Sequence, residues 1–546
     1  MTAARNTGIF SLLIAAGLIA ACGGGGGGGS DGGKQDGVGS SSSASSSAPA
    51  TTPNTVTGWA SVAAPYYGAT GTTAATTGGE GASSAKTYTV TTRAELIQAL
   101  YGNTAQINAD GSIQSGSPDS SKKIIYVSGR ISLNTNKAGT ELAESDYICA
   151  QGTSFSYNSS TVTVSATYTF DAYKNRYDPN GSWGTSAVDK SGDPLEVARA
   201  CAAANQKKVV MLGVPSNTSI LGVSNDAAIV HGTLVIGGSE SAPSDNVVIR
   251  NLTFEDAFDF FPQWDPTDSG GRWNSAYDNI SVMHATHVWI DHNSFSDGAR
   301  PDKLYPPVFA APYNLAEMEV QHHDGLLDIT KRANYVTVSW NHFHDHDKTN
   351  LIGGTDTAAL NAENPAALRI TFHNNYWQNI KQRQPRVRYG MVHVFNNYYD
   401  GTLASSADYK WSAGVVAGQG GKLYIENNAF ALTGGAATAA TIYGSSSVTS
   451  SKTTSCAALA GMSTDLCGAY AYGIGNTLNG ASVDLSTVST TNVTWTATPW
   501  FASNATSGAP QAKPADFYAY TAESAANAAT KVIAGAGAGR ISFTSR

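Results

Sequence analysis

Charge is scarce in this chain of 546 residues, of which only 14% are charged. Methionine is also rare, with 6 copies, whereas glycine occurs 57 times. Amphipathic helices draw on Glu, Lys and Leu, so this composition disfavours a helical fold and suits short strands joined by many turns. The hydrophobic content of 41% is still sufficient for a large core.

Runs of basic residues are missing as well. The formal net charge is -8, and the 33 Lys and Arg residues neither dominate nor cluster. This pattern excludes a general nucleic-acid footprint. It leaves an acidic substrate open, because a local cationic cleft can lie on an acidic protein. We expect a monomer with no nucleic-acid partner.

Residues 1–22 are typical of an export signal, with Arg5 before a mostly apolar stretch at 9–18. That stretch is too short to span a bilayer as a mature helix. Ile19–Cys22 resembles a bacterial lipobox, which predicts a secreted protein tethered to the outer membrane through a lipidated Cys22. The alternative is a plain secretory signal with an incidental cysteine. Residues 23–56, rich in Gly and Ser, form the predicted flexible linker.

Four further cysteines remain, Cys149, Cys201, Cys456 and Cys467. An even number in an exported chain predicts two disulfides, and three pairings are formally possible. The short spacing of Cys456 and Cys467 favours a bond between them, with Cys149–Cys201 as the second. A zinc site is disfavoured, because the spacings fit no common metal-ligand pattern.

Residues 57–546 contain no second linker, and we interpret them as a single domain. Its centre holds short alternating segments in which an Asn usually precedes an aromatic residue by two places, as expected for strands. In five of them the Asn is Asn293, Asn341, Asn375, Asn397 or Asn428, so the steps are 48, 34, 22 and 31 residues.

Repeats of this size must stack on their neighbours to bury their apolar face. Asn at a recurrent turn tolerates left-handed backbone geometry and can hydrogen-bond to its stacked copy. The pattern therefore predicts an all-β fold built as a single-domain parallel solenoid, in which the 22-residue step is one bare coil. A β-propeller is the main rival, but its spacing would be steadier.

Three carboxylates fall at intervals that stacked coils could bring together, namely Asp278, Asp324 and Asp328. Asp324 and Asp328 are four apart, so they would project from the same face of a strand. Lys348, Arg383 and Arg388 fall on the following coils. Oxygen ligands of this type suit Ca²⁺, although spacing alone does not distinguish such a site from solvated surface carboxylates.

Longer motifs carry a resemblance to a known family. They are Phe260–Pro266, Val288–His292, Asp345–Lys348 and Arg383–Arg388. In this order they resemble the pectate lyases of polysaccharide lyase family 1. The resemblance implies a right-handed parallel β-helix and calcium-dependent β-elimination of α-1,4-polygalacturonate, yielding 4,5-unsaturated oligogalacturonides.

The resemblance also implies roles for individual residues. Asp278, Asp324 and Asp328 match calcium ligands, Arg383 matches the general base, and Lys348 and Arg388 match groups that bind substrate carboxylates. Some members carry a further Asp two places before the first ligand, where this chain has Ala276. A base of this kind must first lose a proton, so we expect activity that rises toward alkaline pH.

Other interpretations remain open at this point. An inverting glycoside hydrolase would need a pair of carboxylates, for which Asp345 and Asp347 are available. A non-catalytic adhesin would explain the repeats and the tether but not the charged blocks. A pectin lyase typically replaces the calcium carboxylates. We interpret His322, His323, His344 and His346 as turn and stacking residues rather than metal ligands, Trp289 and Trp377 as core residues, and Asp291 as a structural hydrogen-bonding group.

Overall fold

The computed structural model describes residues 55–64, 74–188, 192–237, 240, 243–496 and 513–545. Contacts group Thr55–Arg546 into one compact unit. The predicted signal peptide with Cys22, and all of the predicted linker except residues 55 and 56, lie outside the described residues. Among the described helices none is both long and apolar enough to cross a membrane.

Three long sheets make up the domain, and apart from β33 with β34 their strands are parallel. The 11-stranded sheet contains, in spatial order, β1 (Thr87–Val90), β4 (Lys123–Val127), β9 (Thr218–Gly222), β12 (Ser244–Arg250), β17 (Ala285–Asp291), β20 (Asn334–Ser339), β23 (Arg369–His373), β26 (Met391–Phe395), β29 (Lys422–Glu426), β32 (Ala469–Ile474) and β35 (Val493–Trp495). The 10-stranded sheet contains β34 (Ala481–Ser482), β33 (Thr477–Leu478), β30 (Ala429–Thr433), β27 (Tyr398–Thr402), β24 (Tyr376–Gln382), β21 (His342–Lys348), β18 (Ser294–Ser296), β13 (Thr253–Glu255), β10 (Ala228–Val230) and β5 (Arg130–Ser132). The 8-stranded sheet contains β31 (Tyr443–Ser445), β28 (Val415–Ala417), β25 (Arg386–Val387), β22 (Leu351–Ile352), β19 (Leu327–Thr330), β16 (Ile280–Met283), β11 (Thr233–Gly237) and β8 (Met211–Val214).

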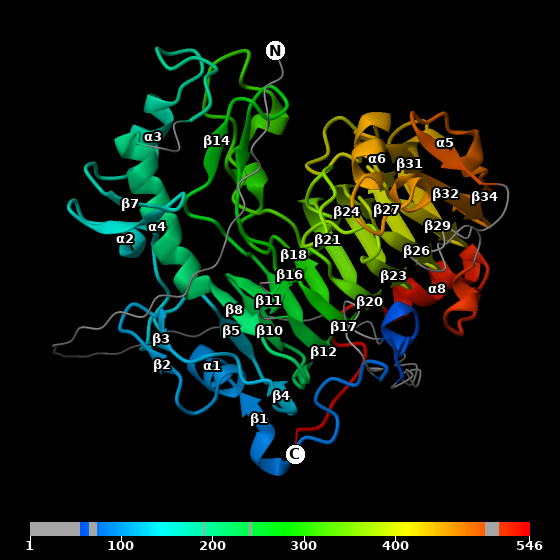
Figure 1. Cartoon of the computed structure of the whole chain (residues 1–546), viewed down its shortest axis with the longest axis horizontal. Coiled ribbons are helices and arrows are strands. Elements are labelled where there is room, and N and C mark those ends of the chain that lie inside the picture. Colours follow the sequence, from blue (N-terminus) through cyan, green and yellow to red (C-terminus); the bar gives the residue numbers. More distant parts are fainter. Residues whose placement is uncertain are drawn as a thin grey trace, which may run out of the picture. The chain divides into compact units, whose positions relative to one another are not determined.

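The chain visits the three sheets in turn. One coil runs through β20, β21 and β22, the next through β23, β24 and β25, and the next through β26, β27 and β28. Figure 1 shows β20, β23 and β26 side by side, running from green toward yellow along the sequence. The fold is a right-handed parallel β-helix, as the sequence predicts, and such crossovers between parallel strands are right-handed almost without exception.

A ladder of asparagines marks the same corner of successive coils. Side-chain amides link Asn293 to Asn341, Asn341 to Asn375, Asn375 to Asn397 and Asn397 to Asn428, each at 3.0 or 3.1 Å. The predicted bonding between stacked copies is therefore confirmed. The ladder extends to Asn476, which the sequence pattern missed because Leu478 stands where the other copies have an aromatic residue.

One detail of that prediction is wrong. The left-handed backbone belongs to the residue before each ladder asparagine, for example Asn374 with φ 55° and Asn396 with φ 52°. The ladder asparagines themselves are free to point inward, where each amide also donates to a backbone carbonyl of the preceding coil. The turn and the ladder thus need two adjacent residues rather than one.

Aromatic rings fill the interior two places after each ladder asparagine. Phe343 stacks on Trp377 with ring centroids 5.3 Å apart, and Trp377 stacks on Tyr399 at 4.7 Å. Trp377 is fully buried, so its interpretation as a core residue is confirmed. Asp291 is buried too and accepts bonds from Arg250 Nε at 2.7 Å and Ser339 Oγ at 2.6 Å, which confirms its structural role.

Helices and hairpins lie outside the coils. They are α1 (Arg93–Tyr101), α2 (Glu144–Tyr147), α3 (Phe170–Arg176), α4 (Pro194–Val210), α5 (Ala439–Ile442), α6 (Ser450–Ala457), α7 (Thr464–Cys467) and α8 (Ala525–Gly535), with the hairpins β2–β3 (Gln106–Ile107, Ile113–Ser115), β6–β7 (Ser154–Tyr157, Ser160–Thr163) and β14–β15 (Gln263–Asp265, Arg272–Asn274). Both predicted disulfides are present, Cys149–Cys201 and Cys456–Cys467. The first fastens the segment after α2 to α4, and the second joins α6 to α7.

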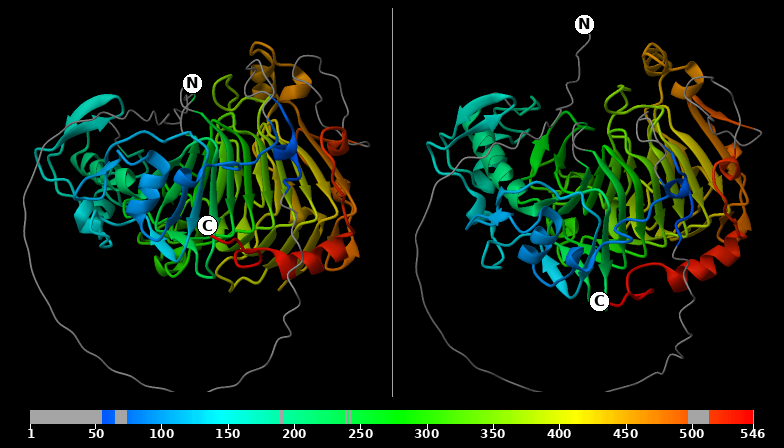
Figure 2. Two further views of the ribbon diagram at one scale, coloured as in Figure 1. Left: turned by 90° about the horizontal axis from the view of Figure 1, so that it is seen from below. Right: turned by 60° about the horizontal axis from the view of Figure 1, so that its bottom comes forward.

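The C-terminal segment runs back along the outside of the coils, as both views in Figure 2 show for α8 in red. Its backbone bonds to three different coils in reverse order along the stack. The N–H of Glu523 donates to Asn396 Oδ1 at 2.8 Å, that of Gly537 to the carbonyl of Trp340 at 2.8 Å, and that of Gly539 to Asn251 Oδ1 at 2.7 Å. The segment therefore ties several coils together.

Candidate active site

Asp278 lies just before β16, which pairs with β11 and β19 in the 8-stranded sheet. Its Oδ1 accepts a 2.9 Å bond from the backbone N–H of Gly325, and its Oδ2 accepts a 2.6 Å bond from Ser281 Oγ. Ser281 pairs with Asp328 across β16 and β19. The two aspartates therefore occupy successive coils, as the sequence spacing predicts.

Asp328 lies in β19 and is 8% exposed, and its Oδ1 accepts a 2.9 Å bond from the backbone N–H of Leu351. Gly325 is enclosed by both carboxylates. A Cβ at Gly325 would lie 2.6 Å from Asp328 Oδ1 and 2.8 Å from Asp278 Oδ1. Glycine is thus required for the two acidic groups to converge.

Asp324 takes a different orientation from the one the sequence suggests. It precedes β19 instead of lying in the same strand as Asp328, so the shared-face argument is wrong for this pair. Its Oδ1 lies 3.1 Å from Lys348 Nζ; the lysine side chain is largely buried, whereas that of Asp324 is half-buried. Thr349 follows Lys348 and accepts bonds from Leu326 and Leu327, which places the ends of β21 and β19 together.

The three carboxylates differ in their ionisation. Burial, and then the charge of Asp324, raises the pKa of Asp278 to about 6. Burial, and then Asp278 and Asp324, raises the pKa of Asp328 well above its usual range. Burial also opposes ionisation of Asp324, but the charges of Lys348 and Arg383 outweigh it and lower that pKa. A bound cation would therefore stabilise the ionised forms of Asp278 and Asp328 most.

The donor set fits a hard divalent cation, because converging carboxylate oxygens are the ligands that Ca²⁺ takes. Within the described ranges no group of three or more His, Cys, Asp or Glu side chains is arranged as a metal site. Two of the three predicted ligands converge, whereas Asp324 is bonded to Lys348.

Arg383 follows β24, one coil beyond Lys348, whose strand partner is Gln382. Its backbone is left-handed with φ 60°, and its carbonyl accepts a 2.9 Å bond from the N–H of Asn350. A left-handed backbone recurs at the turns of this fold, for example at Asn374 and Asn396, so this feature of Arg383 reflects its place at the turn after β24. Its Nε is buried and has no hydrogen-bond partner in the described part of the chain.

Arg388 follows β25, and its hydrogen bonds go to residues other than Asp278, Asp324 and Asp328. Its Nε donates to Asp356 Oδ1 at 2.7 Å and its Nη1 to the carbonyl of Gly353 at 3.1 Å. Asp356 also binds Lys452 Nζ of α6 at 3.1 Å. Nothing in the sequence points to Asp356, because it lies between β22 and β23 in a segment without any motif.

Comparisons with known proteins show which family the chain is similar to. The family model described as pectate lyase matches residues 183–541, a range that includes all six predicted site residues. A pectate lyase of Bacillus subtilis is 41% identical over 65% of this chain and 72% of its own length. The solved pectate lyase of Acidovorax avenae subsp citrulli is 44% identical, covering 92% of this chain and 99% of its own, with a TM-score of 0.77. Another solved structure, described as a pectate lyase bound to hexasaccharide, is 34% identical, covers 89% of this chain and 97% of its own, and has a TM-score of 0.66.

The chain belongs to the pectate lyase family. It is accordingly a polysaccharide lyase, and the interpretations as a glycoside hydrolase or a non-catalytic adhesin are wrong. In this pectate lyase Asp347 is buried and bonded to Gln382 and Gln321, whereas Asp345 is exposed and bonded to Asn379. The two carboxylates offered for hydrolysis therefore have separate structural partners.

The histidines near the site make structural contacts. His322 stacks on Phe258 with ring centroids 4.3 Å apart. His346 donates through Nε2 to the carbonyl of Asp324 at 2.9 Å and lies 2.6 Å from Asp297 Oδ1 through Nδ1. Because a carbonyl only accepts, Nε2 carries the proton of this bond, and the ring supports the backbone at Asp324.

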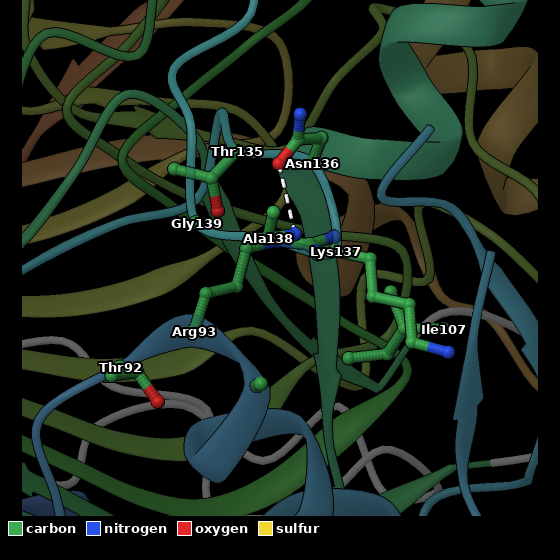
Figure 3. A pocket seen from close by; sticks show the side chains of 9 residues that line it. Thr92, Arg93, Ile107, Thr135, Asn136, Lys137, Ala138 and Gly139 are labelled. Carbon is green, nitrogen blue, oxygen red and sulfur yellow. Dashed lines mark hydrogen bonds between the residues drawn. The ribbon is translucent and has the colours of Figure 1, made fainter. Parts of the chain in front are cut away.

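A small cavity of about 160 Å³ lies elsewhere in this pectate lyase, between the start of α1 and residues 135–139. Figure 3 shows its lining, with the bond of 2.9 Å from the N–H of Ala138 to Asn136 Oδ1. The buried Arg93, one of the lining residues, donates to the carbonyl of Val209 at 2.6 Å. The lining contains no carboxylate and none of the predicted site residues, so it is not the candidate site.

Proposed function

We propose that this pectate lyase is calcium-dependent and cleaves α-1,4-polygalacturonate by β-elimination, releasing 4,5-unsaturated oligogalacturonides. The observation that carries the proposal is the convergence of Asp278 and Asp328 on Gly325, with Arg383 beside them. The solved relative described as bound to hexasaccharide supports an oligosaccharide substrate.

Asp278 and Asp328, joined by Asp324, would hold Ca²⁺. Burial, followed by the charge of neighbouring aspartates, raises the pKa of both converging groups, and a divalent cation would offset both causes. Bound there, the cation supplies a Lewis acid that withdraws charge from a substrate carboxylate. Asp324 would meanwhile keep Lys348 Nζ, at 3.1 Å, close to the same anion.

Arg383 acts on the scissile unit as the general base. The glycosidic bond lies β to the uronate carboxylate, so removal of the C5 proton leaves charge that spreads onto that carboxylate. The proton passes to Arg383, the C5–H electron pair forms the C4=C5 bond, and the C4–O4 bond breaks with O4 as the leaving group. Solvent protonates the departing oxygen. A guanidinium is a base only after losing a proton, so the rate rises toward alkaline pH.

Lys348 and Arg388 bind and neutralise the uronate carboxylates. Lys348 supplies a point charge, and Arg388 has a planar fork suited to two parallel hydrogen bonds. Two of the three Arg388 nitrogens are bonded to Asp356 and Gly353, which orients the fork. These two cations would hold the substrate carboxylate in place and would also stabilise the negative charge that develops on it in the transition state.

We also propose that the enzyme is secreted and tethered to the outer membrane through a lipidated Cys22, with the Gly- and Ser-rich linker giving it reach toward a polymer, and that it acts as a monomer. The support is the lipobox-like Ile19–Cys22 after the apolar stretch at 9–18. A Cys22→Ser variant that remained in the membrane fraction would contradict the lipid anchor, since release into the soluble fraction is expected.

The proposed reaction is tested with an ultraviolet absorbance assay on polygalacturonate, with and without a calcium chelator. Elimination creates a C4=C5 double bond that absorbs, whereas hydrolysis does not. We expect absorbance that grows with time, stops on chelation and returns when Ca²⁺ is restored. Reducing ends released without absorbance would contradict elimination, and a rate unaffected by chelation would contradict calcium dependence. Methylated pectin in the same assay tests the pectin lyase alternative.

A further inference from the structure

A cavity of about 230 Å³ borders the candidate active site on the side away from the carboxylates. Its lining includes Gln382, Arg383, Arg386, Ser412, Ser445 and Ser446. These groups are contributed by the end of β24, by β25, and by the segments next to β28 and β31. The lining is thus rich in hydroxyls and guanidinium groups and contains no carboxylate.

Arg386 points out of the coil into this space. It is the first residue of β25, and its neighbour Val387 is fully buried in the core, so alternation directs the Arg386 side chain outward. Val387 pairs with Ile352, and Ile352 pairs with Ile329. Arg386 therefore lies on the same face as Asp328, two coils further along the stack, or about 10 Å away.

The guanidinium of Arg386 has hydrogen-bond donors that are not used. Its Nη2 donates to Ser446 Oγ at 3.1 Å, and its Nε is buried with no partner among the described residues. No described carboxylate lies within ion-pair distance of it, whereas Arg388 is paired with Asp356. Burial, followed by the charges of Arg388 and Arg383, lowers the pKa of Arg386 to about 10, so it is still charged at neutral pH.

Arg386 is only half-buried, but its buried Nε is costly to leave unpaired, so an anion bound there would stabilise the guanidinium. The polymer proposed above carries one carboxylate on every sugar unit, and a planar guanidinium binds such a group through two parallel hydrogen bonds. The neighbouring serine hydroxyls can bond to sugar hydroxyls in the same cavity. The site therefore has the chemistry of an acidic sugar subsite.

We propose that Arg386, together with Ser446, binds the carboxylate of a second galacturonate unit, away from the unit that is cleaved. This inference rests on the proposed function, since it assigns a further subsite for the same polymer. It predicts that the contribution of Arg386 to substrate affinity depends on the length of the oligogalacturonate. Only oligomers long enough to reach from the catalytic position into the cavity gain from it.

The test measures kcat and KM on oligogalacturonates of increasing length for wild type, Arg386→Gln, Arg386→Lys and Ser446→Ala. For long oligomers we expect Arg386→Gln to raise KM about tenfold, the loss of one charge-assisted contact, with kcat changed little. For the shortest oligomer that is cleaved we expect KM to be unchanged. Arg386→Lys should retain part of the affinity, because it keeps the charge without the fork, and Ser446→Ala should raise KM by a smaller factor.

Arg540→Gln is the matched control, because it removes an exposed arginine from the C-terminal segment and should leave KM unchanged at every length. Equal effects of Arg386→Gln on all lengths would overturn the subsite, as would no effect on any. If Arg386→Gln does not fold, an unchanged long-oligomer KM in both Arg386→Lys and Ser446→Ala overturns it instead. A wild-type enzyme inactive on polygalacturonate would refute the proposed function itself, which is a distinguishable result.

Discussion

Asp278 Oδ1 accepts a 2.9 Å hydrogen bond from the backbone N–H of Gly325, and this contact holds one carboxylate of the candidate metal site against the turn before β19. Gly325→Ala should disrupt the site, because its Cβ would lie 2.6 Å from Asp328 Oδ1 and 2.8 Å from Asp278 Oδ1. The calcium concentration that gives half-maximal activity should rise at least about tenfold as the ligands are displaced. Gly192→Ala is the control, since a Cβ there meets nothing within 4 Å. Equal calcium responses in both variants would contradict the convergence of ligands on Gly325.

Asp356 should act as a positioning residue for Arg388. Removal of its charge in Asp356→Asn leaves the Arg388 fork less constrained, so KM for polygalacturonate should rise several-fold and kcat should change less. Arg388→Gln should have a larger effect, and the double variant should be no worse than Arg388→Gln alone. Additive losses would show that Asp356 acts independently of Arg388.

The asparagine ladder should contribute strongly to stability. Asn375 is fully buried and bonds to Val338 and Asn397 on either side of its coil. Asn375→Ala leaves these groups unpaired and should cost about 2–3 kcal/mol of unfolding free energy, measured by urea denaturation. Asn527→Ala, at an exposed position of α8, should change it by less than about 0.5 kcal/mol. Similar losses for the two variants would argue against the ladder as a stabilising element.

His373 should make the fold sensitive to acid. Burial lowers its pKa to about 4, from an ordinary value of 6.5, so the folded state favours the neutral ring. The unfolded state takes up this proton at a higher pH than the folded state does. The unfolding free energy therefore falls as the pH drops from 6.5 toward 4, by up to about 3 kcal/mol. His373→Phe, which can still stack on Phe395, should therefore lose less stability than wild type between pH 7 and pH 4.5 in urea titrations. Parallel pH profiles for the two proteins would contradict this.

The fold could be predicted because the same residue types recur at the same place in each repeat. A buried amide and an aromatic ring recur on each coil, and this made Asn341 and Asn397 recognisable without any structure. Asn476 was not predicted as a ladder residue, because Leu478 stands where the pattern requires an aromatic ring. The left-handed position could not be assigned from composition, since residues as different as Trp340 and Asn374 occupy it.

The candidate site was only partly predictable. The order of coils correctly placed Asp278 below Asp328 and Arg383 beyond Lys348. The sequence does not determine side-chain direction, so neither the bond from Lys348 to Asp324 nor that from Arg388 to Asp356 was predicted. Asp356 belongs to an inserted segment, where no periodicity relates sequence position to spatial neighbours.

The most direct test of elimination by Arg383 is the rate of C4=C5 formation from polygalacturonate by Arg383→Ala, followed by ultraviolet absorbance at saturating Ca²⁺. Calorimetric binding of hexagalacturonate to the same variant shows whether the rest of the site is intact. We expect the rate to fall by about 10³-fold or more with binding retained, as for loss of a general base. A variant that kept more than about a tenth of the wild-type rate would contradict the assignment of Arg383.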